Sequence, residues 1–70
     1  MNVGDLEEIK DNTTINPVFL ENNGYIKSSM KPVKVLGNGK ISKKIKISAS
    51  AFSASAKDKI EKAGGEIIIL

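Results

Sequence analysis

"KIKISASAFSASAKDKIEKAGGEIIIL", residues 44–70, is the stretch that decides the fold of this chain. Ile45 and Ile47 alternate with polar residues, which is the period of a strand that buries one face. We therefore expect a strand over 41–49, with the two isoleucines in the core and the intervening lysines on the outer face.

A helix should follow this strand. Ala56, Ile60 and Ala63 recur at helical spacing and form a narrow apolar stripe of small residues. Ser53 precedes the stripe, where an N-cap is expected, and a Gly-Gly pair at 64–65 stands where the helix would end. The sequence therefore predicts a helix between these two signals.

The segment after the predicted helix, residues 66–70, reads "EIIIL" and shows no alternation. A run that is apolar on both faces is typical of a strand covered on both sides, as in a parallel sheet. Strand 45–49, helix 54–63 and strand 66–70 would then form a right-handed βαβ unit.

Upstream of this unit, Val33–Leu36 is predicted to be a short strand. Gly37-Asn38-Gly39 separates it from the strand over 41–49, and these residue types tolerate positive φ. We expect a tight hairpin at this point, which would bring Lys40 beside Lys43.

A second, two-turn helix is predicted within "INPVFLENNG", residues 15–24. Asn16 is the expected N-cap, Pro17 occupies the first helical position, and Gly24 can adopt the left-handed conformation after the last turn. Because so short a helix has little intrinsic stability, the packing of its apolar residues 18–20 must hold it.

The expected fold class is α/β: one small domain over residues 1–70, with short mixed or parallel strands covered by two helices. "VGDLEEI", residues 3–9, is compatible with a strand or a turn; as a strand it would complete two strand–helix–strand units in the order β-α-β-β-α-β. The residues that we expect to be buried are Leu20, Val35, Ile45, Ile47, Phe52, Ile60, Ile67 and Ile69.

The composition excludes several classes of function. A chain of 70 residues has a core worth roughly 3–5 kcal/mol. It has no cysteine and no histidine, so disulfides, thiolate metal sites and the common nucleophile–base dyads are excluded. We expect no enzyme activity, metal or cofactor. No apolar run approaches the ~20 residues of a membrane span, and the acidic N-terminus is unlike a signal peptide, so the cytoplasm is the expected location.

Charge is distributed asymmetrically along the chain. Residues 1–24 contain five acids and one lysine, whereas residues 25–50 contain seven lysines and no acid. Such a block either remains solvated or meets an anionic partner. Since the lysines are predicted to face outward from a core too small to need such solubilisation, we favour nucleic-acid phosphate. An anionic membrane is the rival partner, but the lysines lie on a strand and a turn rather than on an amphipathic helix.

Two other features have both a phosphate-binding and a simpler interpretation. "GNGK", residues 37–40, departs from the known phosphate-loop motifs and is better explained as a turn with a lysine beside it. Two serines mark the start of the predicted helix, where free N–H groups attract anions, although capping is the plainer role. Phe52 and Tyr25 are expected to pack rather than to stack on bases. The candidate RNA-binding residues are Lys34, Lys40, Lys43, Lys44, Lys46, Ser53, Ser55 and Lys57.

Residues 34–70, "KVLGNGKISKKIKISASAFSASAKDKIEKAGGEIIIL", resemble the C-terminal domain of the bacterial-type large-subunit ribosomal protein L-fifteen family. "NVGDLEE" and "NPVFLENNGYI" upstream resemble the same family, so the similarity covers nearly the whole chain. The residues that match the family pattern in register are Lys34, Val35, Leu36, Gly37, Gly39, Ile41, Ile45, Ile47, Phe52, Ser53, Ala56, Ile60, Gly64 and Gly65.

The resemblance implies a structural protein of the large ribosomal subunit that binds large-subunit ribosomal RNA, supports its assembly and contacts neighbouring ribosomal proteins. It implies no membrane partner and no small-molecule substrate. The family begins with a long, Gly-rich, basic arm that has no counterpart here, so we expect an isolated or truncated domain in which Met1 is an added start. Arginine is also absent, so any RNA contacts must come from lysines and backbone groups.

Two hypotheses about function therefore stand at the level of sequence. The first is a structural domain that binds ribosomal RNA. The second is a non-enzymatic protein–protein interaction module whose acidic N-terminal third docks a basic partner. Salt dependence separates them, because RNA binding weakens steeply with salt in proportion to the phosphates neutralised.

Overall fold

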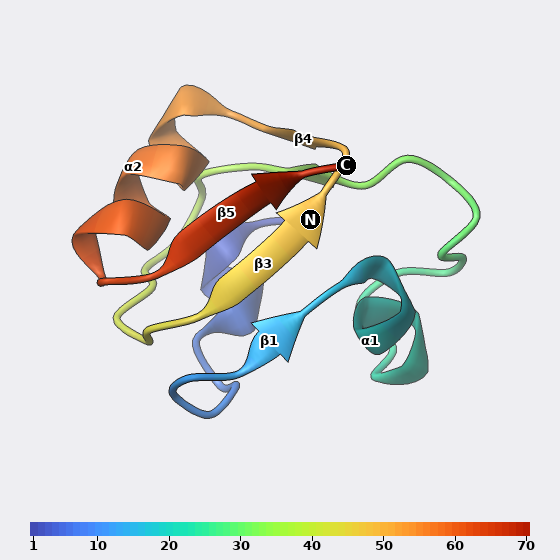
Figure 1. Cartoon of the computed structure of the whole chain (residues 1–70), viewed down its shortest axis with the longest axis horizontal. Helices are drawn as coiled ribbons and strands as arrows, with labels where there is room; N and C mark the ends of the chain where they lie inside the picture. Colours follow the sequence, from blue (N-terminus) through green and yellow to red (C-terminus); the bar gives the residue numbers. More distant parts are fainter.

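The chain folds from short elements joined by longer connections (Figure 1). The computed structural model describes all of residues 1–70. In chain order the elements are the 3₁₀ helix η1 (Val3–Leu6), β1 (Thr14–Ile15), α1 (Pro17–Asn22), β2 (Lys34–Val35), β3 (Lys46–Ala49), β4 (Ala51–Phe52), α2 (Ala54–Lys62) and β5 (Glu66–Ile69).

All strand pairs are parallel. β1, β3 and β5 form one sheet with β3 in the centre, while β2 and β4 form a separate pair. β3, α2 and β5 make the predicted strand–helix–strand unit, in which Lys46 pairs with Glu66 and Ala49 with Ile69. The fold is therefore α/β, with parallel strands in two sheets and two helices, as the sequence predicts.

The predicted hairpin at residues 37–39 is wrong, because the strands on its two sides lie in different sheets. The glycines serve close contacts instead. A Cβ atom at Gly39, whose φ is +91°, would lie 2.7 Å from the Cα atom of Gly4. A Cβ atom at Gly37 would lie 2.7 Å from the Cβ atom of Ser55. The turn is thus pressed between η1 and α2, and only residues without a side chain fit there.

The N-terminal segment, for which the sequence allowed either a strand or a turn, forms the 3₁₀ helix η1 and not a strand. Its start is capped by Asp5, whose Oδ2 accepts a hydrogen bond from the Asn2 backbone N–H at 3.0 Å. Asn2 also forms a single parallel bridge with Leu36, next to β2. Because β1 and β2 lie in different sheets, β1–α1–β2 is not a second unit of the β3–α2–β5 kind.

α1 begins and ends as predicted. The Asn16 Oδ1 accepts a hydrogen bond from the Phe19 N–H at 2.7 Å, and Gly24 adopts a φ of 79° after the last turn. Leu20 is fully buried, whereas Val18 is 54% exposed. The expectation that Val18 helps to hold the helix by packing is therefore wrong.

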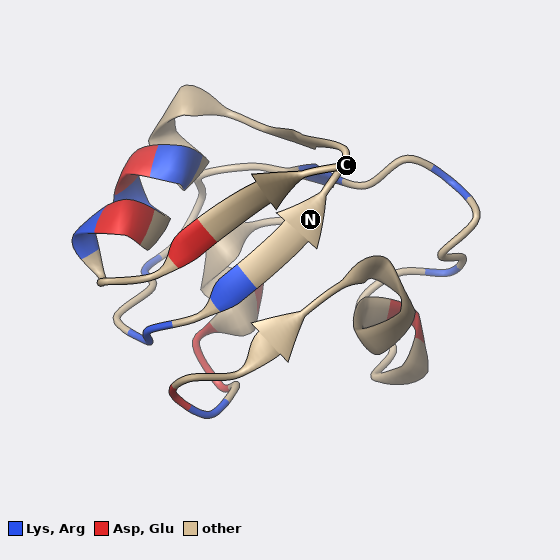
Figure 2. Cartoon of the chain, in the orientation of Figure 1, with Lys and Arg blue, Asp and Glu red and all other residues tan.

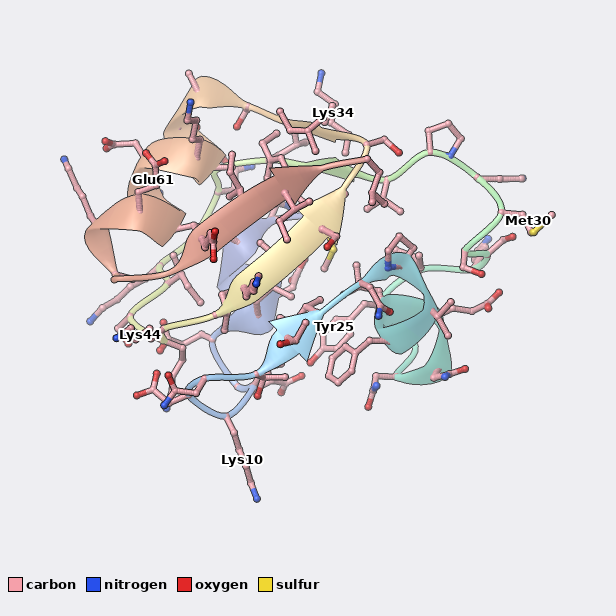
Figure 3. All side chains as sticks on the ribbon, viewed as in Figure 1. Lys10, Tyr25, Met30, Lys34, Lys44 and Glu61 are labelled. Carbon is pink, nitrogen blue, oxygen red and sulfur yellow. The ribbon has the colours of Figure 1, made fainter.

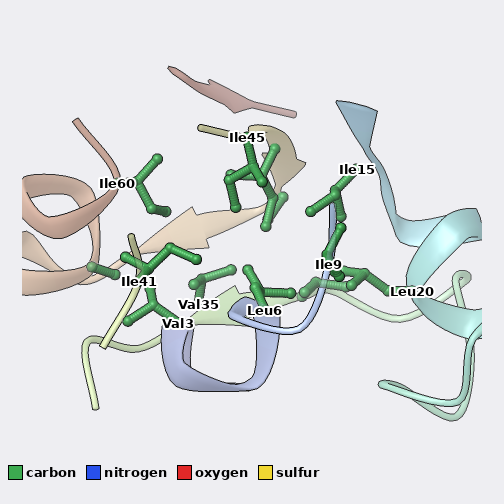
Figure 4. Packing of buried hydrophobic residues seen from close by; sticks show 13 residues of the cluster. Val3, Leu6, Ile9, Ile15, Leu20, Val35, Ile41, Ile45 and Ile60 are labelled. Carbon is green, nitrogen blue, oxygen red and sulfur yellow. The ribbon is translucent and has the colours of Figure 1, made fainter. Parts of the chain in front are cut away.

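One cluster of 13 buried residues forms the core (Figure 4). Its members come from η1, β1, α1, β2, β3, α2 and the loops between them: Val3, Leu6, Ile9, Ile15, Leu20, Val33, Val35, Ile41, Ile45, Ile47, Ala49, Ala56 and Ile60. Of the eight residues predicted to be buried, Leu20, Val35, Ile45, Ile47 and Ile60 are confirmed. Phe52 and Ile67 are only partly buried against this cluster.

The prediction that β5 is covered on both faces is wrong. β5 is an edge strand, and Ile68 and Ile69 are 38% and 68% exposed. The outer face of the three-stranded sheet is open, with exposed Thr14 and Lys46 on β1 and β3 (Figure 1). No helix of the chain has the length and apolar character needed to cross a bilayer.

Candidate nucleic-acid interface

The fold separates the candidate RNA-binding residues into groups. Figure 3 shows Lys34, on β2, at the upper edge of the molecule and Lys44, just before β3, at its lower left. Both side chains are exposed. Lys34 therefore does not share a surface patch with Lys44, because β2 is not the neighbour of β3 in the sheet.

Lys40 belongs to a shallow basic groove. The groove has a volume of about 610 Å³, and its charged lining residues are Lys40 together with Lys59 and Lys62 of α2. Its other lining residues are Gly39, Ile41, Ser42 and Ala63. A hollow lined by charges of one sign concentrates the opposite charge, so this groove suits a phosphate group.

Lys59 anchors the rim of this groove. Its Nζ donates hydrogen bonds to the carbonyl oxygens of Gly37 at 2.5 Å and of Gly39 at 2.7 Å. These bonds tie the turn to α2 and hold an ammonium group beside Lys40. This role of Lys59 could not be read from the sequence, because both carbonyls are distant in the chain. The one signal is helical spacing, since Lys59 borders the buried stripe formed by Ala56 and Ile60.

Lys44 and Lys46 line a smaller hollow of about 200 Å³. Lys46 points to the open face, as the alternation predicts, but its Nζ lies 3.8 Å from the carboxylate of Glu66. Figure 2 shows these charges as neighbouring basic and acidic positions at the starts of β3 and β5. The pair is solvent-exposed and therefore weak, so Lys46 remains free to turn towards a stronger anion.

Glu7 places a negative charge beside Lys40 and the half-buried Lys43. Its carboxylate accepts hydrogen bonds from both the hydroxyl and the backbone N–H of Ser42, the latter at 2.8 Å. The Ser42 hydroxyl is the main cause that lowers the pKa of Glu7 below its ordinary value of 4.5. Desolvation opposes this shift, while the Ser42 N–H and the charges of Lys43 and Lys40 add to it. The basic segment is thus partly compensated by the chain itself.

The other acids in residues 1–24 are also engaged within the chain. All five accept hydrogen bonds: Asp5 from Asn2, Glu7 from Ser42, Glu8 from Tyr25, Asp11 from the Lys44 N–H and Glu21 from Ser29. Carboxylates held in this way are less available to a basic partner, which counts against the protein-docking hypothesis. No three Asp or Glu side chains gather closely enough to hold a metal ion.

Both candidate serines, Ser53 and Ser55, contact other groups of the protein through their hydroxyl oxygens. Ser53 caps α2 as expected, since its Oγ accepts a hydrogen bond from the Ala56 N–H at 3.2 Å. The Ser55 Oγ lies 3.3 Å from the Ser53 Oγ, and its side chain borders Gly37. Lys57 is exposed on α2. The hydroxyls of the two serines are engaged with each other and with the Ala56 N–H, whereas the Lys57 side chain forms no ion pair, so Lys57 can contact a phosphate.

The aromatic residues contact the core. Phe19, Tyr25 and Phe52 are partly buried against the hydrophobic cluster. The Tyr25 hydroxyl donates to the Glu8 Oε1 at 2.6 Å. That hydrogen bond, with smaller contributions from desolvation and from the charges of Glu8 and Asp5, raises the pKa of Tyr25 to about 12. Tyr25 and Phe52 thus pack as expected and do not form a stacking platform for bases.

Comparison with known proteins gives the family. A family model that describes the ribosomal proteins 50S-L15 and 50S-L18e and their 60S counterpart matches residues 1–68. The chain is 49% identical over 70 residues to "Large ribosomal subunit protein uL15" of Prochlorococcus marinus (strain MIT 9313), covering 100% of this chain and 46% of that protein. It is 44% identical over 70 residues to the protein of the same name from Synechococcus sp. (strain CC9311), of which it covers 47%.

A further relative of the same name, from Parasynechococcus marenigrum (strain WH8102), is 46% identical over 66 residues, which are 93% of this chain and 43% of that protein. The chain thus spans a little under half the length of the curated relatives that it matches. These similarities extend over both sheets and both helices. The chain belongs to the family of the ribosomal proteins 50S-L15 and 50S-L18e and their 60S counterpart.

Proposed function

We propose that this chain is part of a structural protein of the large ribosomal subunit and that it binds large-subunit ribosomal RNA in the cytoplasm. The observation that carries this proposal is the family match over residues 1–68. The relatives named above are large ribosomal subunit proteins. In the assembled subunit the chain would support the folded RNA and contact neighbouring ribosomal proteins.

The exposed lysines support RNA as the partner. Lys40 and Lys44 are exposed along the segment between β2 and β3, and Lys57 is exposed on α2. Lysine ammonium groups act as point charges, so they would contact phosphates and position the domain without reading the base sequence. Membership of a family of ribosomal proteins, and not of enzymes, agrees with the expectation that the chain catalyses no reaction.

We also propose that residues 1–70 act as one domain. The single cluster of 13 buried residues supports this, because η1, β1, α1, β2, β3 and α2 all contribute side chains to it. Such an arrangement is expected to unfold in one cooperative transition.

A salt series tests the RNA contact. Lys44→Ala/Lys46→Ala should weaken binding to large-subunit ribosomal RNA fragments and lower the slope of log affinity against log salt by about 1 for each phosphate that the variant no longer neutralises. Lys10→Ala is the control, since it removes a positive charge outside the basic groove and outside the hollow at Lys44 and Lys46. Lys10 adjoins Asp11 in the chain.

The two outcomes that contradict the proposal differ. If the unsubstituted chain shows no salt-dependent binding to these fragments, the chain does not bind ribosomal RNA by itself. If it binds but Lys44→Ala/Lys46→Ala has the same slope as Lys10→Ala, the lysines before β3 serve only solubility.

A further inference from the structure

The connection between α1 and β2 carries a second group of lysines. Lys27, Lys31 and Lys34 line a hollow of about 240 Å³ whose lining contains no acid. Its remaining lining residues are Met1, Ile26, Ser28, Pro32 and Val33. Figure 3 shows Met30, within this connection, at the right-hand end of the molecule and Lys44 towards the left-hand end. This hollow is therefore separate from the basic groove at Lys40.

The lysines of this second group form no ion pair. Lys27, Lys31 and Lys34 are exposed, and the two ion pairs of the chain involve other lysines. The acid that bonds to this loop, Glu21, accepts its hydrogen bonds from Ser29. The segment after β2 differs, because Glu7 lies beside Lys40 and other acids bond to the same segment. The fold thus divides the lysine block in two, and most of the acids that bond to it lie beside the second half. The lysines of the first half have no ion-pair partner and can attract an anion.

Side-chain hydrogen bonds restrain the loop that presents these lysines. The Glu21 carboxylate accepts hydrogen bonds from the Ser29 N–H at 3.2 Å and from the Ser29 hydroxyl at 3.1 Å. The Ser28 Oγ accepts one from the Met30 N–H at 3.1 Å. Since the backbone is already ordered, binding a partner would cost less conformational entropy than ordering a free loop.

Met30 lies at the outermost part of this loop and is 92% exposed (Figure 3). Single exposed apolar residues are common on protein surfaces. Met30 differs from these because it stands between Lys27 and Lys31 on a loop with fixed hydrogen bonds. A flexible thioether between two cations matches the surface of an RNA strand, where apolar base faces and ribose edges alternate with phosphates.

We propose that residues 26–34 form a second RNA-binding surface, in which Lys27, Lys31 and Lys34 contact phosphates and Met30 packs against a base or a ribose. This inference rests on the proposed function and adds a surface opposite Lys44. A domain with basic surfaces on two sides would lie between two RNA segments and hold them at a fixed separation.

Two variants test the proposed surface on large-subunit ribosomal RNA fragments. Lys27→Ala/Lys31→Ala should reduce the salt slope by about 2 and weaken binding roughly 10- to 100-fold near 0.1 M salt. Met30→Ser should weaken binding roughly fivefold and leave the salt slope unchanged, because it removes apolar contact and no charge. Both changes fall on exposed side chains, so urea unfolding should show that the fold is kept.

The controls match each variant in kind. Lys10→Ala removes a positive charge outside both groups of lysines, and Val18→Ser removes an exposed apolar side chain from α1. Neither should change RNA affinity more than twofold. If the unsubstituted chain binds with a steep salt slope and Lys27→Ala/Lys31→Ala behaves like its control, this surface is disproved while the proposed function stands. If the unsubstituted chain shows no salt-dependent binding, both fail.

Discussion

Ile47 and Ile69 lie on adjacent parallel strands but differ sharply in exposure, at 0% and 68%. Ile47→Val should cost about 0.5–1.5 kcal/mol, because it leaves a small cavity in the core. Ile69→Val should change stability by less than about 0.5 kcal/mol. Urea unfolding of the two variants measures this difference. Equal costs would mean that the Ile69 side chain is covered in solution.

Gly39 and Gly24 both have positive φ, at 91° and 79°, but their surroundings differ. A Cβ atom at Gly24 meets nothing within 4 Å, whereas one at Gly39 would lie 2.7 Å from the Cα atom of Gly4. Gly24→Ala should therefore cost about 1–2 kcal/mol for backbone strain alone. Gly39→Ala should cost about 1–3 kcal/mol more, because η1 must also move. Similar unfolding midpoints for the two variants would contradict the close contact between the turn and η1.

Between elements, the Glu7–Ser42 contact joins the segment after η1 to the basic segment before β3. The folded-state pKa of Glu7 is lowered, so the contact stabilises the fold fully above about pH 4.5 and loses this effect as the pH falls through the lowered pKa. Glu7→Gln should flatten the pH dependence of the urea midpoint in that acidic window. Glu61→Gln, which removes an exposed carboxylate from α2, is the control. An unchanged pH profile for Glu7→Gln would exclude the contact.

At the scale of the whole molecule, local sequence signals correctly predicted the helix caps and the buried face of the central strand, but they did not predict which strands pair with each other. Asn16 and Ser53 cap the two helices as expected, because capping depends on residues within one turn. The period of two correctly placed Ile45 and Ile47 in the core. The predicted hairpin was wrong because a glycine can be required either by a tight turn or by a close contact with another segment, and the sequence does not distinguish the two. At Gly39 the requirement is the close contact with Gly4, which only the tertiary structure shows.

The candidate site shows the same limit. The lysine block predicted a basic surface, but sequence order gave no information on which lysines receive an acid neighbour. Glu7 bonds to Ser42, 35 positions away in the chain, and Asp11 bonds to the Lys44 backbone, 33 positions away. The division of the lysines into two opposite groups therefore follows from tertiary contacts and could not be read from the charge pattern.

The parallel pairing of every strand also sets the time that folding takes. Thr14 pairs with Lys46, Lys34 with Ala51 and Lys46 with Glu66, so no pair of strands can form by closing a tight turn. The entropy of closing these long loops is lost before their contacts contribute. Despite its small size, the chain should therefore fold on the order of milliseconds or slower, rather than in the microseconds of helical bundles of similar length. During that interval the apolar β5 is exposed and open to pairing with another chain.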